Sequence, residues 1–437
     1  MPEQLLAGSK SAYSRPEFVV GYKHVDTVKD VLEELGVGHE EVDRDADLGL
    51  GLLRLHDDRD AAVAVGRNPD ASTIRSADAE PTRSVDIPER AASGGTNGSD
   101  ADRPATELDA FLRGLRRHFR QRFAGWAPII GKNRMLGHVV GGGGKISHGG
   151  GGPLMATEDE LPRREGDAGR GVRVGVLDTS MSSNTWLAGA WTSPPGEVLD
   201  QDEAAEVAGH ATFVGGLVLR QAPACVLHAR AVLSNDTGEA DSWSVAKAIV
   251  QLAQSSPHVI NLSFVCYTED GQPPLALATA IDRIGADTVI VAAAGNHGDL
   301  GRRAHQSANE QHGKPDNEGR KPAWPAAFDR VVAVGSASSD GHVSPFTPPD
   351  VQWIDVLAPG SEVLSTFLAS RVTGHSQPFT GYARWSGTSF AAASVSGAIA
   401  ARTRPGSRSP QQAWAQLQEE ARHVSGQPDG PAFLSLR

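Results

Sequence analysis

Five near-continuous apolar runs constrain the fold of this chain more than any other feature. They cover residues 172–177, 226–232, 259–264, 288–293 and 331–334. Helical patterns lie between them, notably at residues 242–254 and 275–284. Strands that are apolar on both faces are typical of a parallel sheet covered by helices on both sides. We therefore expect an α/β main domain over residues 171–405, a three-layer sandwich with a mostly parallel central sheet, and a carboxyl-terminal helix and tail at 406–437.

The amino-terminal part carries a separate pattern. Residues 17–56 read as strand, helix and strand, which predicts a small α+β unit within residues 1–66. Residues 67–107 are rich in Ser, Asp, Pro, Gly and Arg and have scarcely an apolar side chain. Such a segment cannot bury enough surface to offset the entropy of ordering, so we expect a disordered linker.

The segment at residues 108–170 combines a helix and a connector. Apolar side chains recur at helical spacing over residues 108–123, which predicts a basic amphipathic helix. The pattern leaves open whether this helix docks on the small unit or on the main domain. The glycine-rich stretch that follows is not a P-loop, because Val139 and Ile146 stand where that motif needs Gly and Ser or Thr. It predicts a flexible connector.

Composition excludes several classes of function. The 437 residues carry 53 acidic and 41 basic side chains, a net charge of −12, which argues against nucleic acid and anionic membranes as partners. The two cysteines, Cys225 and Cys266, imply neither a disulfide framework nor a metal-ligand cluster. No signal-peptide pattern opens the chain and no apolar stretch has the length of a membrane span. We expect a soluble cytoplasmic protein, with secretion by another route as the alternative.

Four polar residues stand where a serine hydrolase would need them. Asp178 stands at the end of one apolar run, and His210 leads into another apolar stretch. Asn296 is the second residue of a Gly-Asn pair that follows a third apolar run. Ser389 lies in the sequence SGTSFAA, where a Gly-Thr turn enters a helix of small residues. A serine hydroxyl becomes a nucleophile when a base, a group that orients the base, and donors for the oxyanion meet around it. The chain order Asp–His–Ser separates this set from the two other common orders of such triads.

With these motifs the chain resembles the subtilisin-like serine peptidases over residues 171–402. The resemblance implies an acyl-enzyme mechanism with Asp178, His210 and Ser389 as the triad and Asn296 as oxyanion donor. It also implies substrate binding along a strand edge and against a pocket wall, by residues Ser263, Phe264, Val265, Ala294 and Gly295, with a second strand edge near residues 237–241. The implied activity is that of a serine endopeptidase acting on protein or peptide substrates.

The chain departs from the family pattern at several positions. Ala211 and Phe213 stand where the family commonly has Gly and a second His, and Ala393 replaces a common proline. Val265 replaces a glycine in the cleft strand, which adds a side chain where substrate backbone approaches. A long polar loop at residues 297–321 follows Asn296, either a recognition loop or a plain surface insertion.

The same sequence is compatible with other functions. The small amino-terminal unit is somewhat similar to the prodomain of such peptidases, which would bind the catalytic cleft intramolecularly and be removed by self-cleavage; an unrelated interaction module is the alternative. On the same fold, the chain could act as a peptide ligase or cyclase, or as an inactive binding module. We expect no cofactor and no metal ligands; calcium is implied by the family resemblance alone.

Overall fold

The computed structural model describes residues 16–66, 106–138, 152–268, 270–298, 321–349, 351–423 and 431–436. The predictions of a disordered linker, a flexible glycine-rich connector and a loop after Asn296 fall almost wholly outside the described residues. Within these residues, no helix is long and apolar enough to cross a bilayer.

A nine-stranded sheet forms the centre of the main domain, in the order β23-β24-β19-β18-β16-β14-β7-β12-β9. The strands are β7 Arg173–Asp178, β9 Trp191–Thr192, β12 Val226–Ala231, β14 Val259–Leu262, β16 Val289–Ala293, β18 Val331–Ala337, β19 Val356–Pro359, β23 Arg422–His423 and β24 Ala432–Phe433. Every neighbouring pair is parallel except β23 with β24. Each of the five predicted runs overlaps a strand of this sheet, so the predicted α/β fold class is confirmed.

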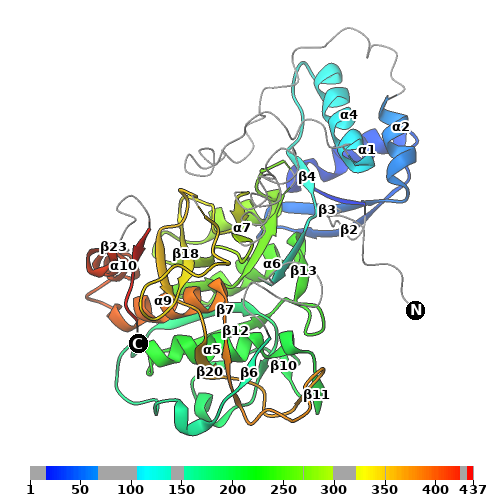
Figure 1. The fold of residues 1–437 in the computed structure, drawn as a ribbon. Coiled ribbons are helices and arrows are strands. Elements are labelled where there is room, and N and C mark those ends of the chain that lie inside the picture. Colours follow the sequence, from blue (N-terminus) through cyan, green and yellow to red (C-terminus); the bar gives the residue numbers. More distant parts are fainter. Residues whose placement is uncertain are drawn as a thin grey trace, which may run out of the picture.

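Helices cover both faces of the sheet (Figure 1). On one face α5, His210–Gln221, packs against α9, Thr388–Arg402; on the other, α6, Ser242–Ala253, packs against α7, Leu275–Arg283. A further helix, α10 at Pro410–Glu420, lies against α9. Small side chains let α9 sit deep in the domain, since every residue from Thr388 to Ala400 is buried. Because β24 pairs with β19, the carboxyl-terminal segment extends the central sheet.

Short strands complete the main domain outside the central sheet. They are β8 Met181–Ser182 paired with β10 Val198–Leu199, β11 Glu203–Ala204 paired with β21 Arg371–Val372, and a sheet of β20 Val363–Thr366, β22 Tyr382–Trp385 and β6 Leu154–Met155.

The small amino-terminal unit is an antiparallel sheet with helices on it. Its strands are β1 Glu17–Gly21, β2 His39–Asp45, β3 Leu50–Leu55 and β4 Ile130–Lys132, in the order β2-β3-β1-β4, and its helices are α1 Val25–Glu34, α2 Asp58–Gly66 and α4 Glu107–Arg122. The amphipathic helix α4 packs against α2 and shares one hydrophobic cluster with β1 and α1. The unit therefore extends past residue 66, where the sequence placed its end, because the apolar face of α4 completes its core.

After β4 the chain crosses into the main domain (Figure 1). Strand β5, Met135–His138, lies between β13, Glu239–Asp241, and β15, Phe264–Tyr267, in a four-stranded antiparallel sheet that ends with β17, Ala323–Trp324. Leu136 is 1% exposed and belongs to the hydrophobic core of the main domain. The sequence had assigned this segment to a connector.

Candidate active site

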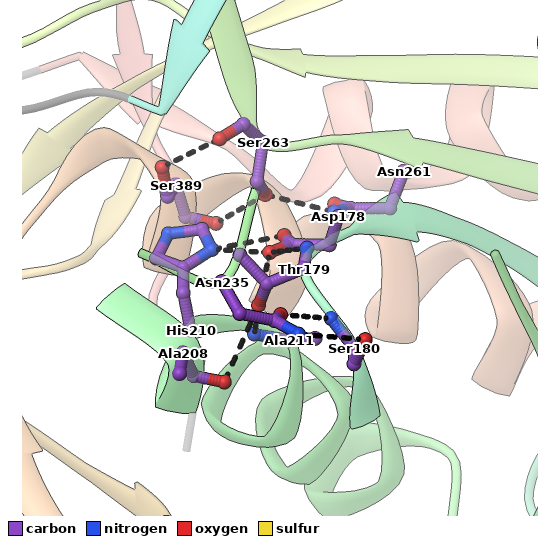
Figure 2. Close-up of polar contacts among 10 residues, drawn as sticks. All are labelled: Asp178, Thr179, Ser180, Ala208, His210, Ala211, Asn235, Asn261, Ser263 and Ser389. Carbon is purple, nitrogen blue, oxygen red and sulfur yellow. Dashed lines mark hydrogen bonds and ion pairs between the residues drawn. The ribbon is translucent and has the colours of Figure 1, made fainter. Parts of the chain in front are cut away.

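Asp178 and His210 meet at the carboxyl end of the central sheet. Asp178 is the last residue of β7 and His210 the first of α5, and each is 1% exposed. The His210 Nδ1 lies 2.7 Å from Asp178 Oδ1 and 2.9 Å from Oδ2 (Figure 2). An ionised carboxylate only accepts hydrogen bonds, so this geometry places the proton on Nδ1 and leaves Nε2 as the basic nitrogen.

Thr179 holds this pair in place. Its backbone N–H donates to Asp178 Oδ1 at 2.7 Å, and its Oγ1 accepts from the N–H of Ala211 at 3.1 Å. Thr179, the residue after β7, thus connects the Asp178 carboxylate to the first turn of α5. Aromatic rings of Phe390 and Trp385 pack on the imidazole, at centroid distances of 5.4 and 5.8 Å.

Ser389 lies in the first turn of α9 and is bonded reciprocally to Ser263. Its hydroxyl donates to the Ser263 carbonyl at 3.1 Å, and the Ser263 hydroxyl donates to the Ser389 carbonyl at 3.1 Å (Figure 2). Asn261 supports this contact, since its Nδ2 donates to Ser263 Oγ at 2.8 Å while its Oδ1 accepts from Ser396 at 3.0 Å. The exit of β14 and the start of α9 are therefore fixed to each other.

Thr388 fixes Asn296 from the other side. The Asn296 Oδ1 accepts from the Thr388 N–H at 3.0 Å and from its Oγ1 at 3.1 Å. The N–H of Gly295 in turn donates to Thr388 Oγ1 at 3.1 Å. Because its amide oxygen is engaged at the helix start, Asn296 turns Nδ2, its donor group, away from Thr388. This orientation suits a donor aimed at an oxyanion beside Ser389.

The remaining predicted site residues flank Ser389 on two sides. Phe264 and Val265 are buried on β15, directly after Ser263, while Ala294 and Gly295 follow β16. The edge of β15 is paired with β5, in the register Phe264 with His138 and Val265 with Gly137. A segment of the same chain thus occupies the position that the sequence analysis gave to a bound substrate.

The departures from the family pattern fall in the packed interior. Ala211, Phe213 and Ala393 are each at most 1% exposed. The Phe213 ring packs on Phe390 at a centroid distance of 4.4 Å and so lies behind His210. These positions act on the site through packing.

Sequence reasoning missed several residues that the structure brings to the site. Hydrogen bonds join Thr388 to Asn296 and Asn261 to Ser263, and Ser396 in turn donates to Asn261. Of these three residues only Thr388 had a signal in the sequence, namely its place in the Gly-Thr-Ser turn. Tyr267 and His297 lie just beyond the predicted strand ends, and nothing in their local pattern pairs them. No cluster of three or more His, Cys, Asp or Glu side chains suited to a metal occurs in the described part of the chain.

The main domain is similar in sequence to known proteins. The model of the Subtilase family matches residues 169–430. Subtilisin DY of Bacillus licheniformis is 31% identical over 251 residues, which cover 54% of this chain and 78% of that protein. Subtilisin BL of Lederbergia lenta is 30% identical over 258 residues, or 56% of this chain and 81% of that protein.

Two solved structures are also similar to part of the chain. A cold adapted subtilisin-like serine proteinase matches with a TM-score of 0.47 and 22% identity, covering 62% of this chain and 90% of that one. A lanthipeptide protease matches with a TM-score of 0.48 and 22% identity, over 62% of this chain and 87% of that one. Since the family match takes in more than half of the 437 residues, the chain belongs to the subtilase family and is a subtilisin-like serine peptidase.

Proposed function

We propose that the chain hydrolyses peptide bonds through Asp178, His210 and Ser389, with Asn296 as oxyanion donor. The observation that carries the proposal is the buried Asp178–His210 hydrogen bond at the same end of the sheet as Ser389. The comparisons support serine peptidase activity in general, and the assignment to these residues rests on their geometry.

The chemistry follows from the positions of the protons. The Ser389 hydroxyl first turns from the Ser263 carbonyl toward His210, whose Nε2 takes the proton as Oγ bonds to the substrate carbonyl carbon. Asp178 stabilises the imidazolium through Nδ1–H. The Asn296 Nδ2 group and the Ser389 N–H donate to the oxyanion. His210 then protonates the leaving amine, and water repeats the sequence to release the acid from the acyl-enzyme.

We propose further that the amino-terminal unit inhibits this site until it is cut off. Strand β5 pairs with β13 on one edge and β15 on the other, as an extended peptide added to a sheet does. The register pairs Gly137 with Val265 and His138 with Phe264, so β5 runs toward Ser263, the hydrogen-bond partner of Ser389. Self-cleavage within a residue or two after His138 follows from this register.

A fluorophosphonate probe tests the nucleophile. We expect the full chain to be labelled at Ser389 and Ser389→Ala to remain unlabelled. Ser394→Ala is the matched control, because Ser394 lies on the same helix and its hydroxyl donates to the Phe390 carbonyl; its labelling should equal that of the unmodified chain. Absence of Ser389-dependent labelling would make the chain an inactive member of its family.

Mass spectrometry of the incubated chain tests the inhibitor. We expect a new amino terminus shortly after residue 138 that is missing from the Ser389→Ala variant. Labelling at Ser389 with no self-cleavage would overturn the inhibitor proposal and leave the hydrolase proposal intact.

A further inference from the structure

Tyr267 and His297 form a hydrogen-bonded pair beside the candidate active site. The Tyr267 Oη lies 2.6 Å from His297 Nδ1, and the two rings meet edge to face with centroids 4.5 Å apart. Burial lowers the pKa of His297 to about 4, so its imidazole is neutral at neutral pH and able to keep this bond. The described interactions give neither side chain a role in the proposed chemistry.

The pair bridges the two segments on either side of Ser389. Tyr267 ends β15, two residues after Val265, and His297 directly follows Asn296. A Cβ added to Gly295 would lie 2.2 Å from Tyr267 Oη and 2.8 Å from His297 Nδ1, so the hydroxyl lies directly against this glycine. The tyrosine thus reaches across the space between β15 and the pocket wall predicted at Ala294 and Gly295.

Tyr267 cannot easily leave this space. Its backbone is paired with Ala323 of β17, which is fully buried, while its hydroxyl is bonded to His297, which is 6% exposed. The residue as a whole is nevertheless 41% exposed, so part of it is open to contact with another molecule. An aromatic residue that is held in place and partly accessible suits the wall of a binding pocket.

We propose that Tyr267, locked by His297, closes the space that receives the substrate side chain before the scissile bond and restricts it to small residues. This inference rests on the proposed function and names the substrates of that same site. A rigid ring excludes a large side chain by overlap, whereas a small one leaves the ring in place. The sequence after His138 reads Val139, Val140 and Gly141, which offers only small side chains for self-cleavage.

The test compares peptide anilides that differ only in the residue before the scissile bond: Ala, Val, Leu or Phe. Rates are divided by the amount of Ser389 that a fluorophosphonate labels in the full chain. For Tyr267→Ala we expect the ratio of kcat/KM for Phe over Ala to rise about tenfold or more, mainly through KM. Tyr267→Phe keeps the ring but removes the hydroxyl that is bonded to His297, so like His297→Asn it should raise the ratio less than Tyr267→Ala does.

Val226→Ala is the matched control, since Val226 begins β12 at the opposite end of the sheet from the site and should leave the profile unchanged. His297→Asn removes the hydrogen bond to Tyr267 but leaves the ring, and it should raise the ratio of kcat/KM for Phe over Ala by less than Tyr267→Ala does. If Tyr267→Ala is not labelled, the ratio measured for His297→Asn tests the proposal in its place. An unchanged ratio in a labelled variant, or an equal loss for every substrate, would overturn the proposal. If the unmodified chain neither labels nor cleaves any peptide, the proposed function fails instead.

Discussion

Thr388 couples the two halves of the candidate site at the level of single hydrogen bonds. Its backbone N–H and hydroxyl both reach Asn296 Oδ1, and its hydroxyl also accepts from Gly295. The residue is fully buried, so these bonds form without competition from water. The predicted oxyanion donor and the predicted nucleophile are therefore held by one neighbouring residue, and a shift of either would disturb the other.

Asn296→Ala should lower kcat by about 10²–10³ with little change in KM, the range found for this donor in subtilisin-type sites. The reason is that Nδ2 meets the oxyanion only after the carbonyl carbon is attacked. Steady-state hydrolysis of a peptide anilide measures the effect, with Asn184→Ala as control, because Asn184 caps a short helix and contacts Gly381. An equal loss of kcat in Asn296→Ala and Asn184→Ala would contradict the role of Asn296 as oxyanion donor.

His297 makes stability depend on pH. Burial holds its pKa in the folded chain at about 4, below the value of about 6.5 expected on unfolding. Between these values the unfolded chain binds more protons, so the free energy of unfolding should fall as pH drops from about 6.5 to about 4, by up to about 3 kcal/mol. In a Ser389→Ala background, urea unfolding at neutral and acid pH should show a smaller loss for His297→Asn. The same loss with and without the histidine would contradict this.

At the level of elements, the strands that could be predicted from the sequence are those that helices bury on both faces. The runs at residues 172–177 and 259–264 were recognisable as strands because a parallel strand covered by helices needs apolar side chains throughout. Strand β5 was not, since four residues next to a glycine-rich stretch carry no periodicity and its two partner edges lie more than a hundred residues along the chain. An amphipathic pattern such as that of α4 tells which face is buried but not which neighbour covers it.

The contact between α5 and α9 depends on Gly397. An added Cβ there would lie 2.5 Å from the Val218 carbonyl oxygen and 2.8 Å from Gln221 Cβ. Because a backbone oxygen cannot move aside, Gly397→Ala should push the helices apart and lower the free energy of unfolding by about 1–3 kcal/mol. Urea unfolding measures this, with Gly285→Ala as control because nothing lies within 4 Å of its added Cβ. Equal stability of the two variants would show that the helix pair adjusts freely.

At the scale of the whole molecule, Asn133 joins the small unit to the main domain. Its Oδ1 accepts from Ser242 Oγ at 2.9 Å and from the Trp243 N–H at 3.0 Å, so it satisfies donors at the start of α6. Its Nδ2 donates to Glu17 of β1 at 2.9 Å. Sequence motifs predicted residues for the site but did not predict this junction, because its partners are single polar side chains far apart in the chain.

Asn133→Ala should loosen the contact between the small unit and the main domain. Loss of these buried hydrogen bonds costs about 1 kcal/mol or more, which corresponds to roughly fivefold or more in the open fraction. We expect a fluorophosphonate to label Ser389 correspondingly faster in the full chain. Gln254→Ala is the control, because its contact with Asp47 lies on the exposed side of the same junction. Equal labelling rates for both variants would show that Asn133 does not hold the small unit over Ser389.

The pairing of β5 with β13 and β15 has a consequence for how such an enzyme would respond to dilution. A strand tethered to its own cleft experiences an effective concentration on the order of millimolar, however little protein is present. A substrate must approach that concentration to compete. Once the connection after His138 is cut, the same contacts become bimolecular, and simple dilution separates them. Cleavage of one peptide bond would thus make activity depend on how far the two fragments spread apart.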